Sequence, residues 1–124
     1  MLLYDWFRMV NVIVVDDDVD SAKVFAEYLE IKGINVVGTG HDGKEAVDLF
    51  IKLHPDIVIL DMLMPEYDGK YAIDKIKKED PNAKIIVVSG YYDRYKLEEN
   101  EVAAIFDKPY EIDKILEAIK KCTW

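Results

Sequence analysis

The chain alternates short apolar runs with segments in which apolar and polar residues recur at helical spacing. Each apolar run is rich in β-branched side chains and lacks the strict alternation of a strand with one face in water. Such runs are typical of parallel strands that are covered on both faces. We expect strands at Val12–Val15, Ile34–Val37, Ile57–Leu60 and Ile85–Val88, and a weaker strand at Val102–Phe106.

Four segments between or after these runs carry apolar stripes that predict amphipathic helices. Gly33 supplies a left-handed stop after the first helix, and His54-Pro55 closes the second. The third begins at Asp68 and ends at Asp80-Pro81, whereas Asp93–Glu101 predicts only a short or loosely held helix. The stripes are Ala22, Phe25, Ala26 and Leu29; Ala46, Val47 and Phe50; Ala72, Ile73 and Ile76; and Ile112, Ile115, Leu116 and Ile119.

Strands that alternate with helices predict the α/β class, with a five-stranded parallel sheet, helices on both faces and right-handed crossovers. In such doubly wound sheets, ligands bind outside the carboxyl ends of the strands. The residues that follow each strand are therefore the candidates for function. They are Asp16, Asp17 and Asp18 after the first strand, Asp61 after the third, Ser89 and Gly90 after the fourth, and Lys108 and Pro109 after the fifth.

Composition narrows the class of function. Sixteen Lys and Arg against 25 Asp and Glu give a net charge of −9, which argues against binding nucleic acid, since that requires neutralising phosphates. The single cysteine, Cys122, cannot form an internal disulfide and favours a reducing compartment. No apolar run is long enough for a membrane span, and the first residues lack the pattern of a secretory signal. We expect a cytoplasmic domain with no nucleic-acid or membrane partner.

Carboxylates that converge from two strand ends repel one another unless they are solvated or bind a cation. Oxygen ligands without His or Cys favour Mg²⁺. Lys108 adds an ammonium that can bind phosphoryl oxygens, and Ser89 adds a hydroxyl donor. This set fits transfer of a phosphoryl group to a carboxylate. Asp61 is the expected nucleophile because it stands alone at a central strand end, and Asp16 and Asp17 are the expected metal-binding pair.

Four fragments stand in a fixed order along the chain: Val14-Val15-Asp16-Asp17-Asp18, Asp56–Pro65 with Asp68-Gly69, Ile86–Gly90 and Phe106–Pro109. Fragments in this order and spacing resemble the response-regulator receiver domain of two-component signalling. The resemblance covers about Asn11 to Lys121, and we assign 1–10 as an N-terminal extension and 11–122 as the receiver domain. It implies the flavodoxin-like strand order 2-1-3-4-5 and, with no output domain following, a stand-alone receiver or an excised fragment.

The resemblance also implies a function. Asp61 would accept phosphate from the phosphohistidine of a histidine kinase or phosphotransfer protein, and a downstream protein target would respond. Asp17 and Asp61 would contact Mg²⁺ directly, Asp16 would help through water, and the Leu63 backbone carbonyl would complete the protein ligands. The chain would then be a signalling phosphoacceptor that catalyses only its own phosphotransfer and slow dephosphorylation, not a turnover enzyme.

The resemblance further implies that Lys108 pairs with the phosphoryl group and precedes Pro109 through a cis bond. Ser89 would swing toward a phosphoryl oxygen and pull on the loop that follows it. Receivers usually carry an aromatic residue or His three positions before the lysine, but this chain has Ile105 there. We therefore expect a switch by rearrangement of the loop and helix across Tyr91–Ala104 instead of an aromatic flip.

The sequence also supports expectations for several other residues. Leu63 and Tyr91 should border the path of hydrolytic water, so their bulk predicts slow loss of the phosphoryl group. Asp18 and Asp20 are expected to cap a helix, and the two histidines, His41 and His54, to be turn residues without a metal-binding role.

The main alternative is a small dinucleotide-binding module built on Gly38–Gly43, which matches a G-x-G-x-x-G pattern. Asp42 argues against it, because an internal anion would occupy the helix N-terminus that a pyrophosphate needs. A flavin carrier and a haloacid-dehalogenase-like phosphatase fit the acidic residues less well. A receiver that serves as a constitutive binding surface is a further alternative.

Overall fold

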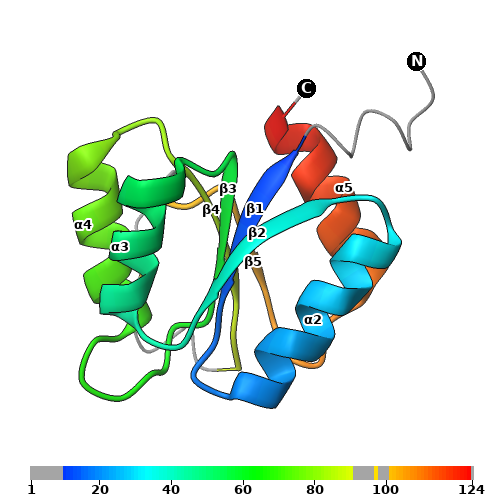
Figure 1. Ribbon diagram of the computed structural model, residues 1–124, viewed down its shortest axis with the longest axis horizontal. Coiled ribbons are helices and arrows are strands. Elements are labelled where there is room, and N and C mark those ends of the chain that lie inside the picture. The colour runs from blue at the N-terminus through cyan, green and yellow to red at the C-terminus, as the bar shows by residue number, and fades with distance from the viewer. Residues whose placement is uncertain (1–9, 91–96, 98–100, 124) are drawn as a thin grey trace.

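The computed structural model describes residues 10–90, 97 and 101–123. These residues form a five-stranded sheet in the order β2-β1-β3-β4-β5, with every neighbouring pair parallel (Figure 1). The predicted α/β class and strand order are confirmed. The strands are β1 (Asn11–Val15), β2 (Asn35–Gly40), β3 (Ile57–Leu60), β4 (Lys84–Val88) and β5 (Ala104–Phe106). The helices are α2 (Val19–Ile31), α3 (Gly43–Leu53), α4 (Gly69–Glu79) and α5 (Ile112–Thr123).

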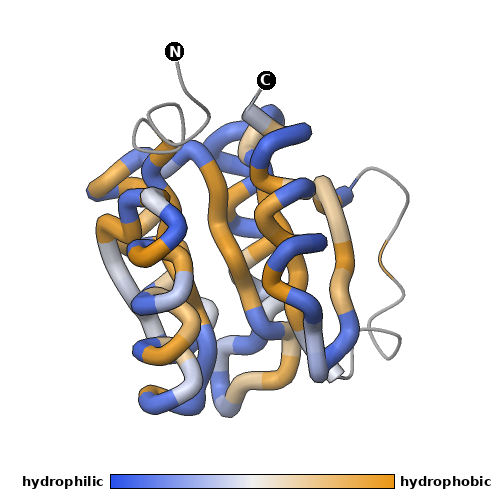
Figure 2. The backbone as a smooth tube through the Cα atoms, turned by 90° about the vertical axis from the view of Figure 1, so that its right-hand side faces the viewer, coloured by the Kyte–Doolittle hydropathy of each residue, from blue (hydrophilic) through white to orange (hydrophobic). Residues whose placement is uncertain are grey.

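Alternate side chains of the strands divide the core into two halves, because successive side chains of a strand point to opposite faces of the sheet. Val12 and Val14 pack in the half that α2 and α5 cover, whereas Ile13 and Val15 pack in the half under α3 and α4. The two pairs of helices lie on opposite sides of the sheet (Figure 1). In Figure 2 the strands are hydrophobic along most of their length, and the helices carry both hydrophobic and hydrophilic turns.

Aspartates begin three of the helices. Asp18, Asp42 and Asp68 each accept hydrogen bonds from backbone N–H groups of the first helical turn that follows, which satisfies donors left free at a helix start. The capping role predicted for Asp18 is confirmed, whereas Asp20 lies inside the first turn of α2 and donates its own N–H to Asp18. The dinucleotide alternative loses its anion site for the same reason, since Asp42 already occupies the start of α3.

Four of the five strands differ from the sequence prediction at one or both ends. Strands β1 and β4 each begin one residue earlier than predicted, at Asn11 and Lys84. Strand β2 begins one residue later than Ile34 and continues to Gly40, because Ile34 instead fills the core below α2 while Gly38-Thr39-Gly40 still pairs with β1. Strand β5 begins at Ala104 instead of Val102. Val102 leaves the ladder and packs against the α3–α4 half of the core.

Three of the sequence predictions fall largely on residues outside those described. Most of the weak helix at Asp93–Glu101 lies there, and so do Tyr91 and residues 1–9 of the proposed N-terminal extension. Val10 is described, is 3% exposed, and joins the core beside α2 and α5. No helix among the described residues is long and apolar enough to cross a membrane.

The outer edge of β2 carries a side-chain contact. The Val36 N–H donates to Glu30 Oε1 at 2.9 Å. Strand β2 is at the end of the sheet, so this N–H has no neighbouring strand to accept it. The Glu30 carboxylate of α2 therefore accepts the hydrogen bond that a neighbouring strand would otherwise accept.

Candidate functional site

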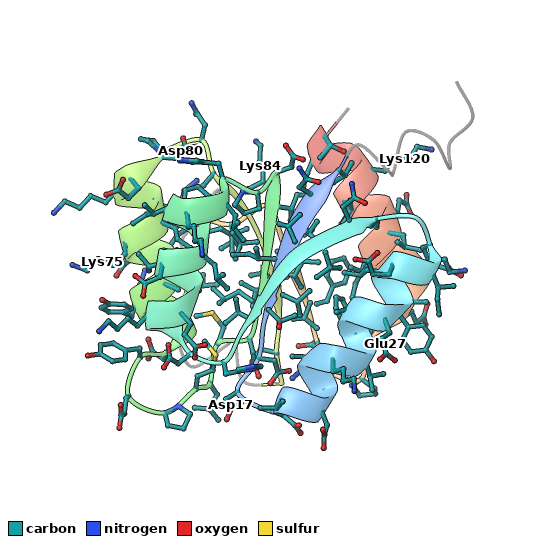
Figure 3. All side chains as sticks on the ribbon, viewed as in Figure 1. Asp17, Glu27, Lys75, Asp80, Lys84 and Lys120 are labelled. Carbon is teal, nitrogen blue, oxygen red and sulfur yellow. The ribbon has the colours of Figure 1, made fainter. Side chains whose placement is uncertain are left out.

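The carboxyl ends of β1 and β3 bring two consecutive aspartates together with a third that is far along the chain. Val15 pairs with Leu60, and the Asp61 N–H donates to the Val15 carbonyl at 2.9 Å, so the residues after the two strands lie side by side. Asp16, Asp17 and Asp61 each offer a carboxylate oxygen, and these atoms lie within 4.8 Å of one another. Figure 3 shows Asp17 just beyond the lower ends of the strands.

Lys108 joins this cluster from the end of β5. Its Nζ lies 3.0 Å from Asp16 Oδ2 and 3.2 Å from Asp61 Oδ2. Burial alone would lower the pKa of Lys108, but the hydrogen bond to Asp16 and the charges of Asp61 and Asp16 outweigh burial and raise it. Lys108 therefore remains an ammonium that neutralises part of the acidic charge.

The three carboxylates differ in exposure and charge environment. Asp16 is 9% and Asp61 8% exposed, whereas Asp17 faces solvent. Burial, followed by the charges of Asp16 and Asp61, raises the pKa of Asp17. The single ammonium of Lys108 thus leaves the acidic cluster with excess negative charge. The three residues offer only oxygen ligands, without sulfur or imidazole. This donor set fits a hard cation such as Mg²⁺, which prefers oxygen.

Ser89 and Gly90 occupy the end of β4. Ser89 is fully buried, and its N–H donates to the Phe106 carbonyl of β5 at 3.0 Å. Gly90 has open space where a Cβ would lie. Ser89 therefore links the end of β4 to the strand that precedes Lys108.

Other predicted residues lie near the site. The bond between Lys108 and Pro109 is cis, as predicted. Ile105 pairs with Val87 and is 37% exposed, so the position of the expected aromatic switch holds a half-exposed aliphatic side chain. Leu63 lies two residues after Asp61 with its side chain 42% exposed. The roles assigned to these residues remain predictions.

The sequence interpretation missed the reason for two glycines. A Cβ at Gly69 would lie 2.6 Å from Met62 Cα and 2.7 Å from the Asp61 carbonyl oxygen. A Cβ at Gly43 would lie 2.3 Å from the Asp68 carbonyl oxygen. Both glycines allow a helix start to approach the loop that follows Asp61, and a glycine next to a helix-capping aspartate was the available signal.

A crevice of about 650 Å³ borders the site between α2 and the segment that follows β5. Asp16, Asp61 and Lys108 line one part of it, and apolar side chains of α2 such as Val24 and Phe25 line another. Apolar surface therefore adjoins the acidic cluster.

The fold and the site define a class of protein: a doubly wound α/β domain with three carboxylates and a lysine at the carboxyl edge of its sheet. A sequence model of the response regulator receiver domain matches residues 12–120. The chain belongs to this family and is a receiver domain of two-component signalling.

Relatives and solved structures agree with this assignment. The chain is 37% identical over 114 residues to the chemotaxis protein CheY of Thermotoga maritima, covering 90% of this chain and 95% of the relative. It resembles the crystal structure of the response regulator TrrA from Thermotoga maritima in complex with Mg²⁺ and BeF, with a TM-score of 0.83, 30% identity, and coverage of 92% and 99%. The CheX–CheY–BeF₃–Mg²⁺ complex from Borrelia burgdorferi matches with a TM-score of 0.77, 29% identity, and coverage of 97% and 93%.

Proposed function

We propose that Asp61 is the phosphoacceptor of this receiver domain and that it takes a phosphoryl group from the phosphohistidine of a histidine kinase or phosphotransfer protein. The observation that carries the proposal is the bridge from Lys108 to both Asp16 and Asp61, beside the exposed carboxylate of Asp17. This arrangement places a buried carboxylate next to a positive charge and next to the groups that would hold a cation.

The transfer uses few protein groups. A carboxylate oxygen of Asp61 attacks phosphorus and forms an acyl phosphate, while the P–N bond of the donor breaks and the imidazole leaves with the electron pair, which then takes a proton. Lys108 already contacts Asp61, so its ammonium is placed to offset the negative charge that the phosphoryl group brings. The reaction consumes the donor and modifies the chain itself, which agrees with a signalling role.

Asp17 and Asp61 would hold Mg²⁺ directly, Asp16 would hold it through water, and the Leu63 carbonyl would complete the protein ligands. When bound, Mg²⁺ supplies positive charge that stabilises the transferring phosphoryl oxygens. The support in this chain is the set of three carboxylates within 4.8 Å of one another with one partly neutralising ammonium.

Ser89 is the proposed start of the conformational response. Its hydroxyl would move to hydrogen-bond a phosphoryl oxygen, and its backbone contact with Phe106 would carry that movement to β5. Ile105 has no aromatic ring to flip, so we propose that the segment Tyr91–Ala104 rearranges instead and changes the surface that a downstream protein binds. Amide exchange across this segment should change when BeF₃⁻ and Mg²⁺ are added; identical exchange would refute the proposed response.

The experiment that tests the phosphoacceptor is incubation with Mg²⁺ and acetyl phosphate, followed by intact mass measurement. We expect one phosphate adduct on the unaltered chain and none on Asp61→Asn. The matched control is Asp48→Asn, which makes the same change on the exposed face of α3 and should still give the adduct.

Two outcomes would contradict the proposal. An adduct on Asp61→Asn would place the phosphate elsewhere. A folded, Mg²⁺-binding chain without any adduct would favour the alternative of a receiver that serves as a constitutive binding surface.

A further inference from the structure

All the backbone and side-chain polar atoms of Asp16 have a partner. The N–H of Asp16 donates to the Gly40 carbonyl at 3.1 Å, and Oδ1 accepts from the Asp18 N–H at 3.0 Å. Oδ2 accepts from Lys108, and the carbonyl oxygen lies 3.1 Å from Nδ1 of His41. The first three contacts are a ladder bond, a turn and an ion pair. The fourth comes from a side chain to which no role has been assigned.

The contact from His41 occurs where the β1–β2 ladder ends. The bond from Asp16 to Gly40 is the last of that ladder. In a continued parallel ladder, the Asp16 carbonyl would accept from the N–H of Asp42, two residues beyond Gly40. Asp42 instead begins α3, and the ring of His41 supplies a donor at this carbonyl. The histidine side chain therefore substitutes for the next ladder bond.

The chemistry of this contact fixes the direction of the hydrogen bond. A carbonyl oxygen can only accept, so Nδ1 of His41 must carry the hydrogen that it donates to Asp16. His41 is partly buried, in contrast to a turn residue that faces water freely. The earlier interpretation of His41 as a turn residue is therefore incomplete.

We propose that His41 is a positioning residue for magnesium binding, which holds the peptide between Asp16 and Asp17 so that the Asp17 carboxylate stays directed toward Asp61. This inference rests on the proposed function. Asp17 is exposed and lies beside two other carboxylates, so repulsion favours its rotation into water. The hydrogen bond from His41 limits such movement, because it fixes the peptide plane before Asp17 and so restricts the backbone motion that would carry the carboxylate away from Asp61.

The test compares His41→Leu, which removes the donor, with His41→Asn, whose side-chain amide can place an N–H near the position of Nδ1. The matched control is His54→Asn, at the other histidine of the chain, which ends α3 with a φ of 46° that asparagine tolerates. Mg²⁺ affinity is measured by calorimetry without any phosphodonor. Loss of one hydrogen bond predicts about five-fold weaker binding for His41→Leu. His41→Asn and His54→Asn should stay within about two-fold of the unaltered chain.

Two further readouts separate positioning from general loss of structure. Phosphorylation by acetyl phosphate should slow in His41→Leu at limiting Mg²⁺ and recover at saturating Mg²⁺, since only cation binding is impaired. Nitrogen-15 spectra of the unaltered chain should show the Nδ1–H tautomer of His41.

The outcomes are distinguishable. Unchanged Mg²⁺ affinity in His41→Leu, a defect that His41→Asn shares, or an Nε2–H tautomer would each overturn the role of His41. None of these results would affect the proposed function, which fails if the unaltered chain forms no phosphate adduct or if Asp61→Asn still forms one.

Discussion

The two sides of the site differ in how firmly the fold holds them. Strands β1 and β3, which carry Asp16 and Asp61, lie inside the sheet, and every residue of both except Asn11 is buried. Strand β5, which leads to Lys108, forms an edge of the sheet, has three residues, and buries none of them fully. Asp16 and Asp61 therefore follow strands whose displacement costs much free energy. Lys108 follows a strand whose displacement costs less, and the Phe106 carbonyl that accepts from Ser89 lies on that same strand. The proposed phosphorylation switch would use this combination of a firmly held Asp61 and an adjustable neighbour.

The largest predicted effect comes from truncating the same side chain on the two kinds of strand. Ile13→Ala should lower the free energy of unfolding by about 2–5 kcal/mol, because Ile13 is fully buried and leaves a cavity. Ile105→Ala should lower it by less than about 1 kcal/mol, because Ile105 is already 37% exposed. Urea denaturation followed by circular dichroism measures both, and equal losses would remove the proposed difference between the strands.

The next effect concerns two glycines that follow neighbouring strands. Gly69→Ala should destabilise the chain by about 1–3 kcal/mol, because the added Cβ would meet the backbone of Met62 and Asp61 at under 3 Å. Gly90→Ala is the matched change, and it should cost almost nothing because the space around Gly90 is open. Thermal unfolding compares the two variants. A tolerated Gly69→Ala would show that the backbone below Asp61 yields more easily than we infer.

A smaller effect is expected at an ion pair between α4 and the segment before β5. Lys70 contacts Glu101, whose side chain is 15% exposed, and lies 3.2 Å from Asp74. Lys70→Met should cost about 1 kcal/mol at low salt and less at high salt. Lys121→Met, which breaks an exposed pair with Glu117 within α5, should change stability by no more than about 0.3 kcal/mol. Denaturation of both variants at two ionic strengths tests this difference. Equal losses of stability would argue that the Lys70–Glu101 contact does not stabilise the segment before β5.

The smallest effect concerns the lifetime of the phosphoryl group. Leu63→Asn should admit hydrolytic water beside Asp61 and speed its loss about three-fold, which is roughly 0.6 kcal/mol in the barrier. Leu53→Asn, at an exposed leucine of α3, serves as the control. Phosphate release from the isolated adduct gives both rates. An unchanged rate in Leu63→Asn would show that this side chain does not limit access of water.

Much of the fold follows from local sequence. The apolar runs of β1 and β3 have no polar residue inside the buried stretch, and Gly33 ends α2 with the positive φ of 92° that its identity suggests. The candidate site residues followed from one topological rule, that the carboxyl ends of parallel strands share an edge. The hydrophobic pattern and this rule were thus sufficient to predict the α/β class and the position of Asp61 at the edge of the sheet.

The remainder depends on packing between distant segments. The pairing of Gly38-Thr39-Gly40 with β1 has no clear sequence signal, because two of the three residues are glycines, which are depleted in strands. The bond from His41 depends on where the β1–β2 ladder ends, and the contact of Lys70 with Glu101 joins residues 31 apart in the chain. Such features arise from tertiary register, which composition and periodicity do not encode.

The carboxylate of Glu30 on the Val36 N–H has a consequence for behaviour at high concentration. An edge strand that pairs with a strand of another molecule must offer free N–H donors. Here one of those donors, the Val36 N–H, is occupied by the carboxylate of Glu30. An approaching peptide carbonyl would meet repulsion at that point instead of attraction. At Val36 the β2 edge is therefore a poorer template for strand addition than an edge with that donor free.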